Sequence, residues 1–381
     1  MRKCLPGLPL PGGRGFGLHC AALLAIILAM RPAAISHETL TTTVLFDREI
    51  VRILNKHCVM CHVENGPSFP LETYEQAWLQ GRAIRADVIA RHMPPWAAVP
   101  GYGQFANDNS LTLRETQFMV SWVEGLGPRN SGTVFTNVVD TAGPRPTVRA
   151  KPDFGHWQLG QPNLSRQLDP NTIEPGQTSQ IKRSVIDLGL MAPRRVRALE
   201  YMPGDRRVLR AAFFTIQETG QWIGSWTPWY GFVELPPAAA FRLPAGSHII
   251  AEIHYQGVKE RATDRGTLGF FFADKPGPNT ASDLVLEANT PAKANRFHAE
   301  TRLTTDTHAV ALRAETGAGV KSIEVSARKA DGGTEILLFA KDIPPDWPTP
   351  YIFKQPVFLS RGTVLSVTTY GGPVKLTVSR Y

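Results

Sequence analysis

The chain has 381 residues, of which 43% are hydrophobic and 19% charged, and its formal net charge at pH 7 is +8. A chain of this length can bury two or three hydrophobic cores. Four of the positive charges, those of Arg2, Lys3, Arg14 and Arg31, fall in the N-terminal leader, and the remainder contains no run of Lys or Arg. The charge pattern therefore excludes an extended nucleic-acid-binding surface.

Residues 1–36 have the pattern of an export signal. A positive flank precedes a mostly apolar run over residues 17–30, and Ala34-Ile35-Ser36 offers small residues at cleavage spacing. The apolar run is shorter than the ~20 residues that a membrane span needs. We expect export to the periplasm with removal of the signal, which leaves no membrane span. An uncleaved anchor is the alternative.

The stretch Cys58-Val59-Met60-Cys61-His62 is the C-x-x-C-H attachment signature of a c-type haem. Two thiols at this spacing can add to the two vinyl groups of one porphyrin, and the histidine that follows is then held under the ring, where it can bind iron. A zinc site would need further Cys or His ligands nearby, and a redox dithiol would need a strand-turn-helix context. The sequence supplies neither, and it therefore predicts one covalent haem c.

The other two cysteines, Cys4 and Cys20, leave with the signal. Haem attachment at Cys58 and Cys61 would therefore consume every thiol of the exported chain. We expect no structural disulfide, so that stability must come from packing.

Three stretches of helical character accompany the haem motif in a predicted unit over residues 37–127. Apolar positions recur at helical spacing in residues 46–54, and a second helix is expected over residues 73–90. Thr112 and Glu115 have the spacing of a capping box before a third helix. Three helices around a five-residue haem motif resemble a small class I cytochrome c.

The second iron ligand is expected in a loop downstream of the motif. Met93 is followed by two prolines that make a rigid turn, and a thioether ligand raises the potential of the haem couple. His92 is the alternative ligand. His57 is expected to be packed or solvent-facing, Met60 belongs to the attachment loop, and Met119 belongs to the apolar face of a helix.

The rest of the chain changes character after a predicted linker over residues 128–153, which is rich in Gly, Pro, Thr and Asn. Short β-rich runs then recur between turn signals, a pattern typical of sandwiches or barrels. The runs are 211–216, 248–255, 268–272, 321–327, 336–340 and 363–369. The predicted fold is therefore multidomain α plus all-β: the helical unit followed by two jelly-roll-like β-sandwiches over residues 154–285 and 286–381.

Several segments of this β region resemble the copper type II, ascorbate-dependent monooxygenases, the peptidylglycine-hydroxylating family. The segments are Met202-Pro203-Gly204-Asp205-Arg206, Leu243-Pro244-Ala245-Gly246-Ser247, Ile253-His254-Tyr255 and Lys321-Ser322-Ile323-Glu324-Val325. From about Leu45 to near the C-terminus, the chain resembles bacterial members that carry a cytochrome c module before the pair of β-sandwiches.

The resemblance implies two copper sites, one held by an adjacent His pair and a third His, the other by His-x-His and a Met. The third His of the first site falls on His254, but Arg210 and Ala211 stand where the His pair belongs. Residues 314–317 contain no His-x-His, and Met202 is the last methionine of the chain. Arginine stays protonated and cannot replace imidazole as a ligand. We therefore expect no copper cofactor and interpret His254 as a vestigial copper position.

These observations predict an exported haem protein that transfers single electrons to or from a redox partner protein, with the β region as a scaffold or docking module. No catalytic residue is predicted. The first alternative is a copper-dependent, ascorbate-type monooxygenase fed with electrons by its haem domain. The second is a ligand-binding β module with a haem redox sensor, in which exposed aromatics would bind the ligand. The aromatic cluster Trp222, Trp226, Trp229 and Tyr230 is more simply explained as core filling.

Overall fold

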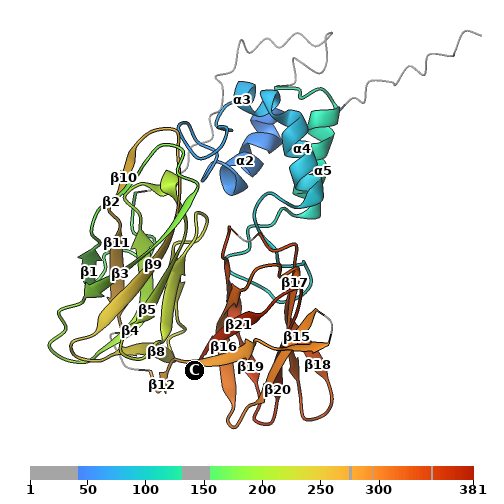
Figure 1. Ribbon diagram of the computed structural model, residues 1–381. Helices are drawn as coiled ribbons and strands as arrows, with labels where there is room; N and C mark the ends of the chain where they lie inside the picture. Colours follow the sequence, from blue (N-terminus) through green and yellow to red (C-terminus); the bar gives the residue numbers. More distant parts are fainter. Residues whose placement is uncertain (1–41, 131–154, 274–276, 294, 345) are drawn as a thin grey trace, which may run out of the picture. The chain divides into compact units, whose positions relative to one another are not determined.

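The computed structural model describes residues 42–130, 155–273, 277–293, 295–344 and 346–381 (Figure 1). The predicted export signal with Cys4 and Cys20, and most of the predicted linker, lie outside these residues. Within them, strands predominate over helices, and the fold is a mainly β, multidomain one with few helices, as the sequence predicted at this level. No helix in this part of the chain is long and apolar enough to cross a membrane.

The helices flank the C-x-x-C-H motif in the N-terminal part of the described chain. They are η1 (Phe46–Ile50, a π-helical turn), α2 (Val51–His57), α3 (Tyr74–Leu79), α4 (Gly81–Ala90) and α5 (Leu113–Glu124). The capping box predicted for α5 is confirmed, because Thr112 and Glu115 each bond to the other's backbone N–H. The helix expected over residues 73–90 divides at Gln80 into α3 and α4.

A small hydrophobic core joins these helices. Phe46 and Trp122 are fully buried at its centre, with ring centroids 6.0 Å apart. Tyr74 of α3 meets Phe46 edge to face at 5.4 Å, an arrangement that aromatic rings favour. Met119, on the inner face of α5, belongs to the same core, as its helical position predicted.

The first β-sandwich extends from residue 164 to residue 280. Its strands are β1 (Leu164–Gln167), β2 (Asn171–Ile173), β3 (Ser179–Asp187), β4 (Arg194–Met202), β5 (Leu209–Ile216), β6 (Trp222–Trp226), β7 (Phe232–Glu234), β8 (Ala239–Leu243), β9 (His248–Gln256), β10 (Ala262–Asp264), β11 (Thr267–Phe272) and β12 (Asn279–Thr280), with a 3-10 turn, η2 (Arg206–Val208), before β5. One sheet has the order β1-β11-β4-β8-β12, with β7 beside β4, and the other has the order β3-β9-β5-β6; β2 and β10 form a separate pair.

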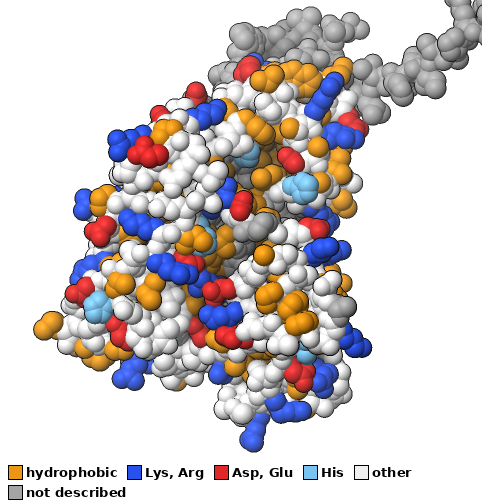
Figure 2. All heavy atoms as spheres, viewed as in Figure 1, with side chains coloured by type: hydrophobic (Ala, Val, Ile, Leu, Met, Phe, Trp, Pro, Cys, Tyr) orange, Lys and Arg blue, Asp and Glu red, His pale blue; other side chains and the backbone are white. Residues whose placement is uncertain are grey.

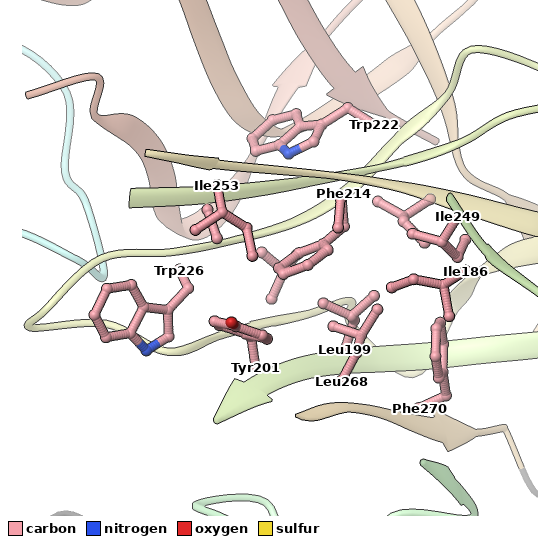
Figure 3. Close-up of a cluster of buried hydrophobic side chains, with 14 of the residues drawn as sticks. Ile186, Leu199, Tyr201, Phe214, Trp222, Trp226, Ile249, Ile253, Leu268 and Phe270 are labelled. Atoms are coloured by element: carbon pink, nitrogen blue, oxygen red, sulfur yellow. The ribbon is translucent and has the colours of Figure 1, made fainter. Parts of the chain in front are cut away.

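The core of this sandwich is packed between the two sheets (Figure 3). Leu199 and Tyr201 of β4 lie beside Phe214 of β5, and all three side chains are buried. Trp222 and Trp226 are 3% and 1% exposed, so these two tryptophans fill the core as expected. Trp229 is only half-buried, and it lies at the functional site described below.

The second β-sandwich begins directly afterwards, at Ser282. Its strands are β13 (Ser282–Ala288), β14 (Pro291–Lys293), β15 (Arg296–Arg302), β16 (Thr307–Thr316), β17 (Ser322–Arg328), β18 (Thr334–Lys341), β19 (Pro350–Leu359), β20 (Val364–Tyr370) and β21 (Val374–Arg380). They form two sheets, β13-β21-β16-β19 and β14-β15-β20-β17-β18. The change of sandwich falls at Ala281, four residues before the end of the range 154–285 expected from the sequence, because β12 pairs with β8 and β13 pairs with β21.

A segment between α4 and α5 packs into the second sandwich rather than against the helices. Trp96, Ala98 and Phe105 are buried in the core of that sandwich, and Ala98 and Phe105 form isolated β-bridges with Ala340 and Phe353. The side chain of Asn107 donates to the carbonyl of Pro350 (2.7 Å) and accepts from the N–H of Ile352 (3.0 Å). The range 37–127 is thus continuous in sequence but shares its loop with the C-terminal sandwich.

Candidate functional site

The C-x-x-C-H motif forms a tight turn at the end of α2. Cys58 is the C-cap residue of that helix, and its N–H donates to the carbonyl of Leu54 (2.9 Å). The carbonyl of Cys58 accepts from the N–H of Cys61 (3.0 Å) and of His62 (2.9 Å). The backbone therefore fixes the two thiols and the imidazole relative to one another before any group is bound.

The two thiols and the imidazole line one cavity, together with the loop that contains Met93. The lining of this cavity, here called the haem cavity after the attachment signature in its wall, is mostly apolar and includes Cys58, Cys61, His62 and Met93. Hydrophobic side chains are visible over the helical part of the chain, among charged side chains of both signs (Figure 2). The mostly apolar lining of the cavity suits a largely apolar cofactor.

The hydrogen bonding of His62 leaves one ring nitrogen available. Its Nδ1 lies 2.9 Å from the carbonyl oxygen of Phe69, which can only accept, so that Nδ1 carries the proton and Nε2 keeps its lone pair. Burial lowers the pKa of His62, although the Phe69 hydrogen bond and the nearby Asp87 act in the opposite direction. A neutral imidazole oriented through Nδ1 is the arrangement that metal-binding histidines require.

The two cysteines are unpaired and half-buried. Burial raises the pKa of both thiols to about 12. The nearby Cys61 raises the pKa of Cys58 further, whereas Arg206 acts against the rise at Cys61. A redox-active C-x-x-C motif works through a thiolate of lowered pKa. Neither cysteine has the lowered pKa of such a thiolate.

Met93 and His92, the two residues predicted as candidates for the second iron ligand, lie in different surroundings. Met93 lines the haem cavity, whereas His92 is absent from its lining. The side chain of His92 is 70% exposed, and its Nδ1 lies 3.6 Å from Asp87. Met93 is itself 37% exposed, and the choice between the two ligands stays a prediction. Met60 and Met119 line the same cavity, so the sulfur of Met93 is one of three thioethers near it.

His57 is one of the residues packed beside the motif. Its ring is buried, and Nδ1 lies 3.1 Å from the carbonyl oxygen of Asn109, while Nε2 lies 3.3 Å from Glu115 Oε1. Burial alone would raise the pKa of Glu115, but hydrogen bonds from Thr112 and Lys56 lower it to about 2. Both ring nitrogens of His57 are occupied, as expected for a packed residue.

The β region also contributes to the haem cavity, which the sequence reading did not anticipate. Arg210 and Gln256 of the first sandwich line it, and so do Trp229 and, from the second sandwich, Trp347. The indole N–H of Trp229 donates to the carbonyl of Asn107 (3.0 Å), which belongs to the same segment between α4 and α5 as Met93. No local sequence pattern marks these residues, because only the packing of the sandwiches brings them to the motif.

A second cavity, with a volume of about 300 Å³, lies between the two sandwiches. Of the positions implied for copper, Arg210, His254 and residues 314–316 line it. Ala211 is buried in β5 and pairs in register with His254 of β9. The Nε2–H of His254 donates to Glu252 (3.0 Å), and the ring meets Phe213 edge to face. His254 is thus a hydrogen-bonded strand residue.

Charged side chains from both sandwiches meet at Glu252, in the wall of this inter-sandwich cavity. Arg313 of β16 donates to Glu252 of β9 (3.2 Å) and stacks over Phe213 at 4.2 Å, and Arg183 of β3 donates to the other oxygen of Glu252 (2.8 Å). The hydrogen bond from His254 is the main cause that lowers the pKa of Glu252 to about 2. The carboxylate oxygens of Glu252, which could otherwise bind a metal beside His254, are therefore engaged in ion pairs.

The other histidines of the β region lie apart from this cavity. His248 bonds to Glu218 (2.8 Å), His298 bonds to Thr368 (2.9 Å), and His308 stacks on Tyr381 with centroids 5.0 Å apart. Among the residues that the structure describes, no group of three or more His, Cys, Asp or Glu side chains is arranged to hold a metal ion.

Comparisons with known proteins add little to this description. No family model matches the chain, and no curated protein matches it. Among solved structures it is similar to that of Sulfolobus Turreted Icosahedral Virus (10% identity, TM-score 0.27, 57% of this chain and 90% of that chain). Others are PBCV-1 VP54 fitted into a reconstruction of the virophage Sputnik (9%, 0.22, 60% and 95%) and the PBSX exported protein XepA (9%, 0.18, 57% and 86%). Likenesses with TM-scores this low carry no argument about function.

Proposed function

We propose that this chain is an exported c-type haem protein that transfers single electrons, and that its β region is a scaffold that completes the haem site. The observation that carries the proposal is the His62 hydrogen bond to Phe69, which leaves Nε2 unprotonated beside two thiols in one apolar cavity. When bound, haem supplies an iron that alternates between the ferric and ferrous states, and the exchange of one electron with a redox partner protein follows from that.

The chain's own residues have distinct roles in this proposal. Cys58 and Cys61 would each form a thioether bond with the porphyrin, His62 would be the proximal ligand, and Met93 the distal one. The mostly apolar lining of the haem cavity would lower the polarity around the iron, which helps to keep its potential high. The resemblance to a cytochrome c module before two monooxygenase-like sandwiches supports the same assignment.

The test is covalent attachment. Protein expressed with a haem-attachment system and exported should keep its haem through denaturation and acid-acetone extraction, and it should give a reduced spectrum of c type. The double variant Cys58→Ala/Cys61→Ala should release all of it. Asn55→Ala, at an exposed position on α2, is the matched control and should retain the haem. Retention of haem by the double variant would contradict the proposal.

Export has its own readout. If residues 1–36 are a cleaved signal, the N-terminal sequence of periplasmic protein should begin at His37. A protein that keeps residue 1 and sediments with membranes would support the uncleaved anchor instead.

A further inference from the structure

Arg210 borders two cavities at once. It lines the haem cavity and also the inter-sandwich cavity, and Trp347 is shared between them in the same way. The first sandwich carries Arg210 at the start of β5, in the position where the family resemblance would place a copper-binding histidine. Its side chain is 19% exposed, so the guanidinium is held mostly out of water.

Contacts with Gln256, Trp347 and both the carboxylate and the carbonyl of Asp346 fix the direction of the Arg210 side chain. Its Nε donates to Oε1 of Gln256 (2.9 Å), and Gln256 is itself 4% exposed and donates to the carbonyl of Arg207 (2.9 Å). The guanidinium lies over the ring of Trp347, 5.5 Å from its centroid. Nη1 lies 3.4 Å from Asp346 Oδ2, but that carboxylate is 68% exposed and weakened by solvent. The cation is therefore held in place and only partly balanced.

The neighbouring arginines differ in their charge balance. Arg207 donates to Asp205 and Glu260, so that its charge is paired twice, and it also contacts the carbonyl of Asn65 just beyond the haem motif (3.4 Å). Arg206 donates to the carbonyl of Pro228 and lies over the ring of Trp226, 5.1 Å from its centroid. This short segment of the first sandwich therefore carries positive charge beside the haem motif. Within the segment, Arg210 lines the haem cavity.

We propose that Arg210 is an electrostatic positioning residue of the haem site and that its guanidinium offsets the charge of the haem propionates. The inference rests on the proposed haem and goes beyond it, because it makes the β region a determinant of the potential. A fixed positive charge in an apolar wall acts more strongly than one in water, and it favours the iron state with one electron more. Arginine suits the role because it stays protonated and matches carboxylates with a rigid fork.

The experiment is a spectroelectrochemical titration of the haem in the full chain and four variants. Arg210→Gln should lower the equilibrium constant for reduction about tenfold, which is about 59 mV for one electron. Arg210→Lys keeps the charge and should remain within a factor of two of wild type. Gln256→Leu leaves the charge without its anchor and should lower the constant about threefold. Arg183→Gln, a 69% exposed arginine outside the haem cavity, is the charge-matched control and should change nothing.

An unchanged potential in Arg210→Gln, with haem still attached, would overturn this inference and leave the haem assignment intact. An equal fall in Arg183→Gln would overturn it as well, because the effect would then be one of net charge. Should Arg210→Gln not accumulate, the Gln256→Leu titration decides in its place, and an unshifted value there counts against the inference. Absence of covalent haem from the wild type would overturn both proposals together.

Discussion

The haem cavity and the inter-sandwich cavity differ in the hydrogen bonding of their histidine side chains. In the haem cavity, His62 commits only Nδ1 to a hydrogen bond and keeps the lone pair of Nε2. In the inter-sandwich cavity, His254 donates Nε2–H to a carboxylate that also accepts from Arg183 and Arg313. A metal site needs deprotonated ligands held ready by their neighbours. The first cavity meets that requirement, whereas the second has its polar groups satisfied among themselves.

The largest effect is expected at the haem cavity, from substitution of the proposed distal ligand. Met93→Ala should abolish the far-red charge-transfer band between sulfur and ferric iron, because no other side chain in that loop supplies a thioether. Absorption spectroscopy of the oxidised protein measures it, with His92→Ala as the control that should keep the band. A band that survives in Met93→Ala but disappears in Met119→Leu would move the ligand to α5.

Breaking the ionic network should affect stability without affecting the haem. Glu252→Gln leaves two arginines without their shared carboxylate, one of them only 12% exposed, and should lower the free energy of unfolding by about 3 kcal/mol. Denaturant titration measures this change, while the reduced haem spectrum should stay as in wild type. The control is Glu315→Gln, whose side chain is 39% exposed and 3.9 Å from Arg313. A shifted haem spectrum in Glu252→Gln would show that the two cavities are not independent.

The free energy of unfolding should depend on pH through the buried carboxyl group of Asp283. This carboxyl accepts from the N–H of Trp222 (2.7 Å), while its Oδ1 is buried with no hydrogen-bond partner among the described residues. Burial raises its pKa from 3.8 to about 6. A raised folded-state pKa stabilises the protein while the group is protonated, so that this contribution is lost as pH rises from about 4 to about 6. At 1.36 kcal/mol per pKa unit, the loss is about 3 kcal/mol at most.

Glu252 has the opposite dependence. Its pKa is lowered to about 2, so its contribution is complete above about pH 4.5 and is lost as pH falls toward 2. Unfolding measured from pH 3 to pH 7 should therefore show a slope between pH 4 and 6 that is absent from Asp283→Asn and present in Glu252→Gln. The same slope in Asp283→Asn would assign it to another group.

The smallest expected effect is that of copper. His254 is bonded to Glu252, and Arg210 and Ala211 stand where the resemblance implies a pair of histidines. Added copper should therefore leave the melting temperature of the full chain unchanged. Chelators should also leave it unchanged. Equilibrium dialysis with copper and haem quantified together provides the count. Close to two tightly bound coppers per chain would restore the monooxygenase reading. One weakly bound ion that is lost in His254→Ala would indicate a vestigial site.

The sequence was informative wherever the structure depends on near neighbours. Four of the six predicted β runs lie within β5, β9, β11 and β18, and the other two begin one residue before β17 and β20. The capping box at Thr112 forms as expected. Periodicity and caps act over a few residues, so a single sequence displays them. The turn at Cys58-His62 is equally local, which is why its thiols and imidazole could be placed together in advance.

The sequence was uninformative where distant segments meet. The packing of Trp96 and Phe105 into the second sandwich has no local signature, since an apolar residue near two prolines could cover either domain. The wall of the haem cavity formed by Arg210 and Trp347 is another case, because the two residues are 137 positions apart and meet only after both sandwiches have formed. The boundary at Ala281 depends on strand pairing, which composition does not reveal.

The insertion of the loop between α4 and α5 into the C-terminal sandwich has a consequence for biogenesis. Asn107 bonds to Pro350 and Ile352, at sequence separations of 243 and 245 residues. A chain emerging from its N-terminus can complete α2 and the C-x-x-C-H turn early, but the support of the distal loop arrives only with the last strands. Such long-range closure is slow compared with local helix formation. Under the proposed function, the attachment turn would therefore form before the loop that holds Met93 has its full support.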